Sequence, residues 1–379
     1  MVVYIITKLE LGGAQKVCLS LIHGLHDNNQ PVSLISGNEG ILVGEVQKFS
    51  NVYLLPTMKR EVRLKGLFAE IKNFFQLIKT LKKINKSTKD LIVHTHSTKA
   101  GILGRWAALF AGVRHRVHTV HGFGFNAYQS WPTWLVIYML ELVTSLITNH
   151  VVCVSENDRR IGSKLFPLFN KKSSVIRAAV DTQVFLPATT KLPCHKQFTI
   201  GTVSCFKPQK NLFDLLRAFK YVYTEACKRG LPLPHLEIIG GGTLQPDIET
   251  WISQQKLTSA ISLLGWQHKV AEFMDGWDLY AMSSLWEGLP CSIVEARLKR
   301  LPVVAYQVDG IPEVIINGKN GFLEKPGDWH ALADRMLELV ENKKLHEQLS
   351  NFNDNLGDFD TKIMVKKHLE LYQTFKASP

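Results

Sequence analysis

The stretch SLWEGLPCSIVEA, residues 284–296, sets two glutamates, Glu287 and Glu295, eight positions apart around a Gly-Leu-Pro. It follows the apolar run DLYAMSS, which reads as a strand, and includes SIVEARL, which has helical spacing. Pro290 suits the first position of a helix because that position needs no amide donor. The amides of the first turn would then face outward at the positive end of the helix dipole, where a phosphate binds well.

The two acids flank this candidate phosphate site, which includes Gly288 and Leu289. Glu287 precedes the helix start, and Glu295 lies about five residues inside it, roughly 7–8 Å along the axis. Carboxylates pair well with sugar hydroxyls, as the acid of dinucleotide-binding folds does with ribose. The spacing therefore fits a nucleotide-sugar, with the sugar near Glu287, the diphosphate at the helix end and the ribose near Glu295. A capped helix with two solvated acids is the alternative.

Length and composition indicate a soluble chain of two domains, with 379 residues, 45% of them hydrophobic and 21% charged. The window closest to a membrane helix, residues 131–148, is interrupted by Pro132 and Glu141. The N-terminus MVVYIITKL reads as a first strand and not as a leader, so we expect a cytoplasmic protein. The six cysteines form no CxxC pair and show no zinc spacing, which predicts reduced thiols.

Short β-rich runs alternate with helical patterns along the whole chain, which predicts parallel sheets with helices on both faces. Two such series stand in tandem, and we expect two Rossmann-like, doubly wound domains over 1–185 and 196–357. Prolines and polar residues interrupt the pattern at 181–197, where we place the boundary. A last helix over 361–376 could pack on either half. Ligands bind beyond the carboxyl ends of parallel strands, so a cleft between the domains is the expected site.

Several further stretches, taken in order, carry a family resemblance. They are LGGAQKV near the N-terminus, HTVHGFGF at 118–125, FKPQKN at 206–211, IIGGG at 238–242 and PVVAYQVDGIPEVIINGKNGFL at 302–323. Together with the paired glutamates, they resemble glycosyltransferase family 4, whose members are nucleotide-sugar-dependent enzymes of the GT-B fold. The HGFGF form is similar to the branch that builds bacterial capsular and surface polysaccharides.

The resemblance implies roles for individual residues near the transferred sugar. Glu287 matches the acid beside that sugar, and His121 matches a histidine that faces it, so both are the expected catalytic residues. Gly12 and Gly13 match a glycine loop that approaches the donor phosphate or the acceptor, where glycine permits close backbone approach. The alternatives are a satisfied loop histidine and a plain strand-to-helix turn.

Other matched residues would hold the nucleotide. The resemblance places Glu295 on the ribose hydroxyls, and it places Lys210 on the diphosphate, where a cation offsets the charge of the leaving group. Trp266 would pass close to the base, unless it serves ordinary packing. A solvated lysine at a helix start is the alternative for Lys210.

The chain departs from the family pattern in two places. Cys205 stands where relatives commonly have an arginine five residues before the diphosphate lysine, so either Lys207 replaces it or Lys210 and the helix end act alone. The Pro-Asn-Gly that usually precedes the Val-Asp of the interdomain loop is Arg-Ala-Ala here, at 177–179.

Basic residues gather in the first half of the chain. Residues 1–200 carry 25 Lys and Arg against 11 Asp and Glu, or +14, whereas residues 201–379 carry 20 against 22, or −2. The helical pattern over 65–86 has apolar residues on one face and lysines on the other, which suits an anionic membrane surface or a helix packed on a sheet. The apolar stretch 131–140 is a second candidate contact. We expect a lipid-linked saccharide acceptor at the membrane, and no nucleic-acid partner, since no binding motif is present.

These observations together predict a retaining, metal-independent glycosyltransferase that moves a hexose or N-acetylhexosamine from a nucleoside diphosphate. Retention is implied by the family alone, and no cofactor is expected. His94 and His96 lack a third ligand or an HExxH spacing, so we expect no metal. Asp358 and Asp360 should cap the last helix or lie at the surface. The alternatives are a nucleotide-sugar epimerase on the same fold or a catalytically silent membrane-bound partner subunit. A glycoside hydrolase is less favoured, because a helix end between the acids serves phosphate.

Overall fold

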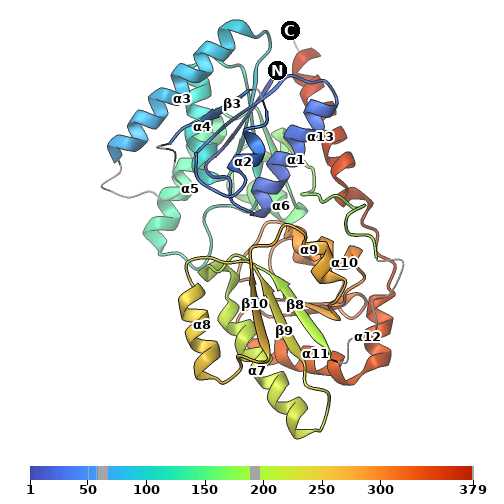
Figure 1. The fold of residues 1–379 in the computed structure, drawn as a ribbon. Coiled ribbons are helices and arrows are strands. Elements are labelled where there is room, and N and C mark those ends of the chain that lie inside the picture. Colours follow the sequence, from blue (N-terminus) through green and yellow to red (C-terminus); the bar gives the residue numbers. More distant parts are fainter. Residues whose placement is uncertain (50, 57, 59–66, 188–196, 378–379) are drawn as a thin grey trace. The chain divides into compact units, whose positions relative to one another are not determined.

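The computed structural model describes residues 1–49, 51–56, 58, 67–187 and 197–377. The chain divides into two compact units (Figure 1). Unit 1 comprises Met1–Ala179 and Asp360–Pro379, and unit 2 comprises Val180–Phe359. Parts of the basic stretch, at 59–66, and of the expected domain boundary, at 188–196, lie outside the described residues.

Unit 1 is built on a parallel sheet, and its described residues contribute seven strands in the order β3-β2-β1-β4-β5-β6-β7. The strands are β1 (Val2–Ile6), β2 (Val32–Ser36), β3 (Val52–Leu54), β4 (Ile92–His96), β5 (His115–Val120), β6 (His150–Cys153) and β7 (Ser173–Val175). The helices are α1 (Gly13–Asp27), α2 (Val43–Val46), α3 (Leu67–Ser87), α4 (Thr98–Phe110), α5 (Trp131–Leu146), α6 (Glu156–Leu165), the 3₁₀ turn η2 (Phe169–Lys172) and α13 (Thr361–Ala377). The alternation of strand and helix in the sequence thus produces the predicted parallel sheet.

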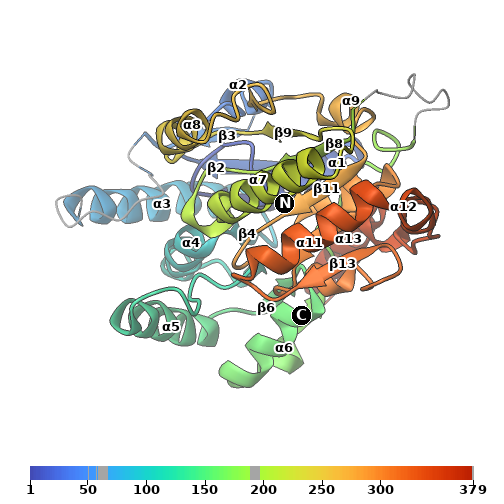
Figure 2. The ribbon, with the colours of Figure 1, turned by 90° about the horizontal axis from the view of Figure 1, so that it is seen from below.

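Alternating side chains of the central strands meet helices on opposite faces of this sheet, as the pleat of a strand requires. Ile5 and Thr95 lie against Gly104 of α4, where an added Cβ would come within 2.8 Å of Thr95. On the other face, the hydroxyl of Tyr4 lies 2.8 Å from that of Tyr372 in α13. Figures 1 and 2 show α3, α4 and α5 together on one side of unit 1, with α1 and α13 on the other.

Helix α13 returns from the end of the chain to pack on α1. At Gly24 of α1, an added Cβ would meet Val365 at 2.4 Å, so only glycine allows this approach. Asp360 begins the helix as its cap, with a side-chain oxygen that accepts from the Lys362 amide at 2.7 Å. The expected capping role of Asp360 is therefore confirmed.

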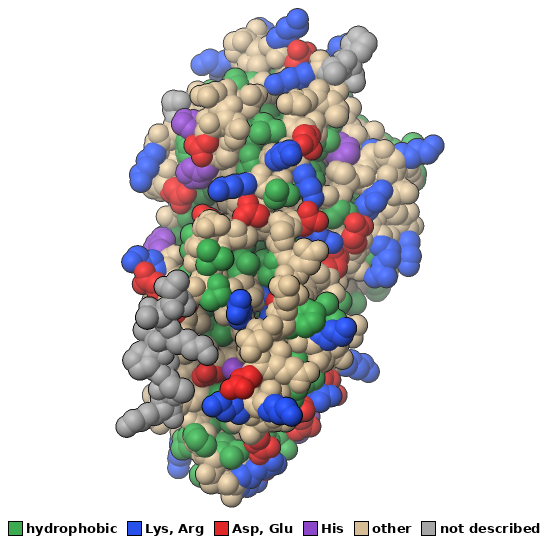
Figure 3. Space-filling view, turned by 90° about the vertical axis from the view of Figure 1, so that its right-hand side faces the viewer, with side chains coloured by type: hydrophobic (Ala, Val, Ile, Leu, Met, Phe, Trp, Pro, Cys, Tyr) green, Lys and Arg blue, Asp and Glu red, His purple; other side chains and the backbone are tan. Residues whose placement is uncertain are grey.

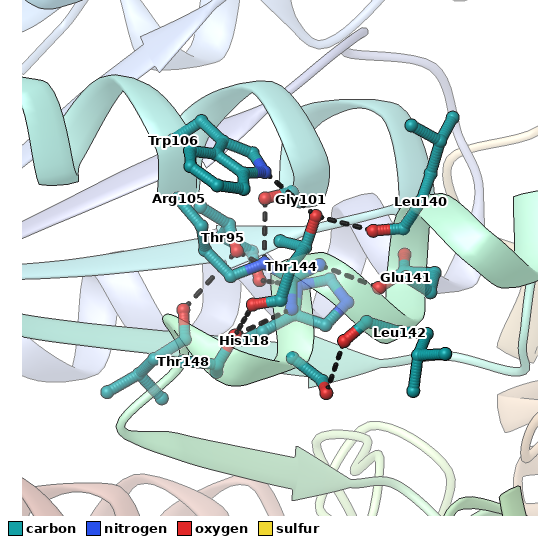
Figure 4. A network of polar contacts seen from close by, with 12 residues as sticks. Thr95, Gly101, Arg105, Trp106, His118, Leu140, Glu141, Leu142, Thr144 and Thr148 are labelled. Atoms are coloured by element: carbon teal, nitrogen blue, oxygen red, sulfur yellow. Dashed lines mark hydrogen bonds and ion pairs between the residues drawn. The ribbon is translucent and has the colours of Figure 1, made fainter. Parts of the chain in front are cut away.

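A buried polar cluster joins α5 to α4 (Figure 4). The guanidinium of Arg105, which is 1% exposed, donates to Glu141 at 2.8 Å and to the Thr148 hydroxyl at 3.0 Å. The Trp106 indole donates to Thr144 at 3.0 Å. These polar side chains of α5 therefore point into the protein, and the buried ion pair adds to the apolar packing of Trp134, Ile137, Tyr138 and Leu142 on the cluster around Phe125 and Phe166.

Unit 2 has a second parallel sheet, whose order within the described residues is β10-β9-β8-β11-β12-β13. The strands are β8 (Thr199–Val203), β9 (His235–Ile239), β10 (Ile261–Gly265), β11 (Leu279–Met282), β12 (Val303–Tyr306) and β13 (Gly321–Glu324). The helices are the 3₁₀ turn η3 (Pro208–Lys210), α7 (Leu212–Lys228), α8 (Gln245–Gln254), α9 (Val270–Met274), α10 (Cys291–Leu298), the 3₁₀ turn η4 (Ile311–Glu313), α11 (Trp329–Glu341), α12 (Lys343–Ser350) and the 3₁₀ turn η5 (Gly357–Phe359). Among the described residues, no helix has the length and apolar character needed to cross a bilayer.

Candidate active site

In the sheet of unit 2, the strand order reverses between β8 and β11. In doubly wound sheets, ligands bind outside the carboxyl ends of the strands at such a switch point. The segment after β8 contains η3, and the segment after β11 contains Glu287 and leads into α10. The topology therefore brings Lys210 and Glu287 together, although they are 77 residues apart in the sequence.

Lys210 and Glu287 form an ion pair in which the Lys210 ammonium group donates to the carboxylate. Their side chains are 18% and 8% exposed, respectively. Both alternatives that assumed solvated side chains at these positions are therefore wrong. The pair places one positive and one negative group side by side at the switch point.

Backbone contacts fix the loop that carries Glu287. The Gln209 side chain donates to the Trp286 carbonyl at 2.8 Å, and the Leu285 amide donates to the Gln209 carbonyl at 2.9 Å. The Glu287 amide donates to a carboxylate oxygen of Asp309 at 2.7 Å. Asp309 adopts a left-handed conformation, with φ 43°, which Asp tolerates better than most residues. The sequence alone does not identify Gln209 and Asp309, because each of them acts through a contact between loops that are distant in the sequence.

Helix α10 begins one residue later than expected. Pro290 is its N-cap, with φ −75° and ψ 110°, and Cys291 is the first helical residue. The Pro290 side chain makes no capping hydrogen bond, so it offers no acceptor to the amides of the first turn. Leu289 is 7% exposed, and the Gly288 carbonyl accepts from the Gly310 amide at 3.0 Å.

Glu295 lies inside α10 and is 4% exposed, so it is not a solvated acid. Burial, and to a smaller extent the Glu295 charge, raise the pKa of Tyr280, whose hydroxyl donates to Ser292 at 2.7 Å. The carboxylate therefore stands close to polar groups at the base of the helix. A buried acid close to a helix N-terminus can serve a ligand that carries both hydroxyls and phosphate.

Trp266 follows β10 at the same edge of the sheet and is 41% exposed. Its indole nitrogen lies beside Gly241, where an added Cβ would approach it to 2.9 Å. The preceding Gly240 has φ 131°, and a Cβ there would meet the Ser204 carbonyl at 1.9 Å. The IIGGG turn therefore needs glycine to bring the ends of β8, β9 and β10 together.

The remaining predicted residues belong to unit 1. Gly12 is the N-cap of α1 and Gly13 its first residue, and a Cβ on Gly13 would meet nothing within 4 Å. His121 follows β5 and lies 2.9 Å from His96, measured from Nε2 to Nδ1. Burial, with a smaller contribution from His368, lowers the pKa of His121 to about 3, so its imidazole is neutral at pH 7.

His94 and His96 are fully buried in β4 and contact protein groups. In the described ranges of the chain, no group of three or more His, Cys, Asp or Glu could hold a metal ion. Cys205 is partly buried, and its carbonyl accepts from the Lys207 amide at 2.8 Å.

Comparison with known protein families gives two matches, which follow one another along the chain. The family described as "Glycosyltransferase Family 4" matches residues 11–184, and "Glycosyl transferases group 1" matches residues 190–355. Their junction falls within the expected domain boundary.

Two relatives match over most of the chain. An Escherichia coli UDP-Gal:alpha-D-GlcNAc-diphosphoundecaprenol alpha-1,3-galactosyltransferase is 30% identical over 372 residues, which cover 96% of this chain and 94% of that protein. An N,N'-diacetylbacillosaminyl-diphospho-undecaprenol alpha-1,3-N-acetylgalactosaminyltransferase of Campylobacter jejuni is 24% identical, covering 80% of this chain and 81% of the relative.

Solved structures share the fold. Alr3699/HepE from Anabaena, in complex with UDP-glucose, superposes with a TM-score of 0.80 at 18% identity and covers 98% of this chain and 99% of its own. A sucrose-phosphate synthase from Thermosynechococcus elongatus gives 0.81 at 18% identity, with 100% and 99% covered. These likenesses confirm the predicted GT-B fold.

Proposed function

This chain belongs to glycosyltransferase family 4, and from that premise we propose that it transfers a hexose or N-acetylhexosamine from a nucleoside diphosphate to a lipid-linked saccharide. The observation that carries this proposal is the Lys210–Glu287 pair at the switch point of unit 2. It adjoins the N-terminus of α10, on which Glu295 also lies. Cation, helix end and two acids are the groups that a nucleotide-sugar requires.

The donor is held by unit 2 in this proposal. The diphosphate binds the Lys210 ammonium group and the first-turn amides of α10, with Gly288 and Leu289 at the turn. Glu295 accepts hydrogen bonds from the ribose hydroxyls, and Trp266 flanks the base. Because the Lys210 charge already faces a carboxylate, a phosphate would be the second anion that this ammonium group stabilises.

In the transfer step, the bond from the anomeric carbon to the diphosphate oxygen breaks, and a bond to an acceptor hydroxyl oxygen forms. Lys210 and the α10 terminus stabilise the negative charge that the leaving diphosphate gains, without a divalent metal. The acceptor proton passes to a departing phosphate oxygen on the same face, which retains the configuration. Glu287 and His121 hydrogen-bond the transferred sugar, and Gly12 and Gly13 approach the donor phosphate or the acceptor.

The names of two relatives support a polyprenol diphosphate as the lipid carrier, because each name specifies a sugar linked to diphosphoundecaprenol as the acceptor. One of them also names UDP-Gal as the donor. We therefore place UDP-sugars first among the donors, and bacterial surface polysaccharide synthesis as the process.

An amphiphilic acceptor of this kind would bring the enzyme to the cytoplasmic face of a membrane. Helix α5 has an exposed apolar surface that could contact the membrane. Of the twenty exposed large hydrophobic residues in the described part of the chain, eleven lie on α3, α4 and α5. Seven of these form one face of α5: Trp131, Leu135, Val136, Met139, Leu140, Val143 and Leu146, at 41–75% exposure. Patches of this kind mark interaction sites in soluble proteins.

Helix α3 adds both apolar and cationic groups to this side of unit 1. Its second half packs on the sheet through Leu77, Leu81 and Ile84, whereas Phe68 and Phe75 are 87% and 63% exposed. Five lysines of α3 are exposed: Lys72, Lys79, Lys82, Lys83 and Lys86. By contrast, on the face shown in Figure 3, apolar side chains are scattered among cationic and anionic ones. The α3–α5 side is thus the membrane-facing side in this proposal, with lysines for anionic headgroups.

Calorimetric titration of the full chain with UDP- and GDP-sugars tests the donor site. The proposal expects at least one UDP-sugar to bind, with unchanged affinity in EDTA. Absence of binding by every nucleotide-sugar at millimolar concentrations would instead favour a silent partner subunit.

A further inference from the structure

His96 is a buried histidine in direct contact with His121. It is 0% exposed, and its Nδ1 lies 2.9 Å from Nε2 of His121. Its other nitrogen, Nε2, is buried without a hydrogen-bond partner in the part of the chain that the structure describes. Burial lowers the pKa of both imidazoles, so each carries a single proton at neutral pH.

Only two proton arrangements are then compatible with a hydrogen bond between the rings. If His121 donates from Nε2, the proton of His96 must sit on its own Nε2, which leaves a buried N–H without an acceptor. If His96 donates from Nδ1, its Nε2 is a bare lone pair, and His121 carries its proton on Nδ1. An orphaned donor is the rarer and costlier state in proteins, so the second arrangement is favoured.

The surroundings of His96 keep its ring in place. The ring lies 4.7 Å from that of His94 and 5.7 Å from that of Tyr4, between centroids. His94 is itself fixed at both nitrogens, by Thr119 at 2.7 Å and by Tyr372 of α13 at 2.5 Å. The donor of His96 is therefore aimed at His121 by packing from β1, β4 and α13.

We propose that His96 is a positioning residue that fixes His121 as the tautomer protonated on Nδ1. His121 then offers that N–H as a donor to a ligand oxygen, while Nε2 is occupied by His96. His121 retains exposed surface, whereas His96 has none, which suits a ligand contact through His121 alone. The use of this N–H on the transferred sugar rests on the proposed function, but the tautomer does not.

The tautomer can be observed directly in the full chain labelled with ¹⁵N-histidine. Long-range ¹H–¹⁵N correlation spectra distinguish the two neutral forms, and the signals of His121 are assigned by their loss in His121→Asn. We expect the Nδ1–H form in the unmodified chain and in His96→Asn, because the Asn amide nitrogen can donate from the place of Nδ1. We expect His96→Gln and His96→Leu to convert His121 to a mixture or to the Nε2–H form.

An Nε2–H form of His121 in the unmodified chain would overturn the proposal, and so would an unchanged tautomer in both His96→Gln and His96→Leu. If His96→Leu fails to fold, His96→Gln, which stays polar and has a similar volume, decides alone.

Kinetics add a readout that separates positioning from folding. In His96→Gln, kcat should fall on the order of 10- to 100-fold, as for other residues that orient a functional histidine, with UDP affinity unchanged. His96→Asn should recover most of it. Equal losses of kcat in His96→Asn and His96→Gln would contradict the proposal. If the chain transfers no sugar but shows the expected tautomers, only the proposed function is contradicted.

Discussion

At the scale of single residues, the two glutamates that open the sequence argument have different surroundings. Glu287 is paired with Lys210 and its loop is held by Asp309. Glu295 is buried within α10, where burial of Tyr280 and, to a smaller extent, the Glu295 charge raise the pKa of that tyrosine. The sequence predicts both acids as ligand-binding residues, but it gives no sign that one of them neutralises Lys210. That contact depends on how two loops meet, which spacing along one segment does not encode.

Substitution of the two acids should separate binding from turnover. We expect Glu295→Ala to weaken UDP-sugar binding by roughly 1.5–3 kcal/mol, the value of lost hydrogen bonds to a charged group. Glu287→Gln should mainly lower kcat and leave donor affinity within a few-fold. Calorimetry and initial rates measure both, with Glu272→Gln as the control, since Glu272 is exposed on the same unit. Unchanged turnover in Glu287→Gln with normal donor affinity would contradict the placement of Glu287.

At the scale of elements, periodicity predicts α1, α3, α4 and α7 within a few residues, because their apolar stripes face the sheets. It does not predict α5, which has apolar residues on both its inner and its outer side. Its inner side carries Glu141 and Thr144, which bond to α4, and also apolar residues that pack on the core, namely Trp134, Ile137, Tyr138 and Leu142. Seven other apolar residues face outward. A stretch that is apolar on its outer side has no solvent-facing polar stripe, so its spacing gives no clear helix signal.

The exposed apolar face of α5 makes a direct prediction for membrane binding. Val136→Ser combined with Met139→Ser removes two exposed apolar side chains, each contributing about 1.5–3 kcal/mol when fully buried in lipid. We expect vesicle affinity to fall by at least about 100-fold, measured by flotation with vesicles of phosphatidylglycerol and phosphatidylethanolamine.

Ile316→Ser, at an exposed apolar position in unit 2, serves as the matched control and should bind like the unmodified chain. The α5 contribution should persist at high salt, whereas the contribution of the α3 lysines should be screened. Undiminished flotation of the double variant would rule out α5 as the membrane contact. A dimer in solution that dissociates in the double variant would assign the face to a second copy of the chain.

At the scale of the whole molecule, alternating strands and helices are sufficient to predict two parallel units, because the pattern is local. The side on which α13 packs could not be predicted. Its packing depends on Gly24 meeting Val365 and on Tyr4 bonding Tyr372, residues more than 300 positions apart. The sequence also does not predict several elements, namely β6, β7, β13, α6, α11 and α12. One of them, β7, is only three residues long.

The histidines of unit 1 should make its stability depend on pH. Burial lowers the pKa of His94, His96 and His118 well below 6.5 and that of His368 to about 4. The groups that face them are one another, Arg105, His121 and His150. The charge of Arg105, and the charge of any neighbouring histidine that becomes protonated, lower these pKa values further.

The folded state therefore holds these imidazoles neutral while the unfolded chain protonates them below pH 6.5. Stability is fully present above pH 6.5 and is lost as pH falls toward the folded values, by about 1.4 kcal/mol for each such histidine at pH 5.5. Hydrogen exchange followed by mass spectrometry at pH 7.5 and 5.5, corrected for intrinsic rates, should show reduced protection in β4, β5 and α13. Equal protection at both values would contradict this account.

The central claim, that the chain is a nucleotide-sugar-dependent transferase, is tested most directly by product formation. The full chain is incubated with UDP-sugars and a short polyprenol diphosphate carrying N-acetylglucosamine, and the lipid product is analysed by mass spectrometry and by NMR of the anomeric proton. We predict an acceptor-dependent gain of one hexose or N-acetylhexosamine in the α configuration, unaffected by EDTA. An epimerised nucleotide-sugar formed without acceptor, and no glycosylated lipid, would contradict the claim.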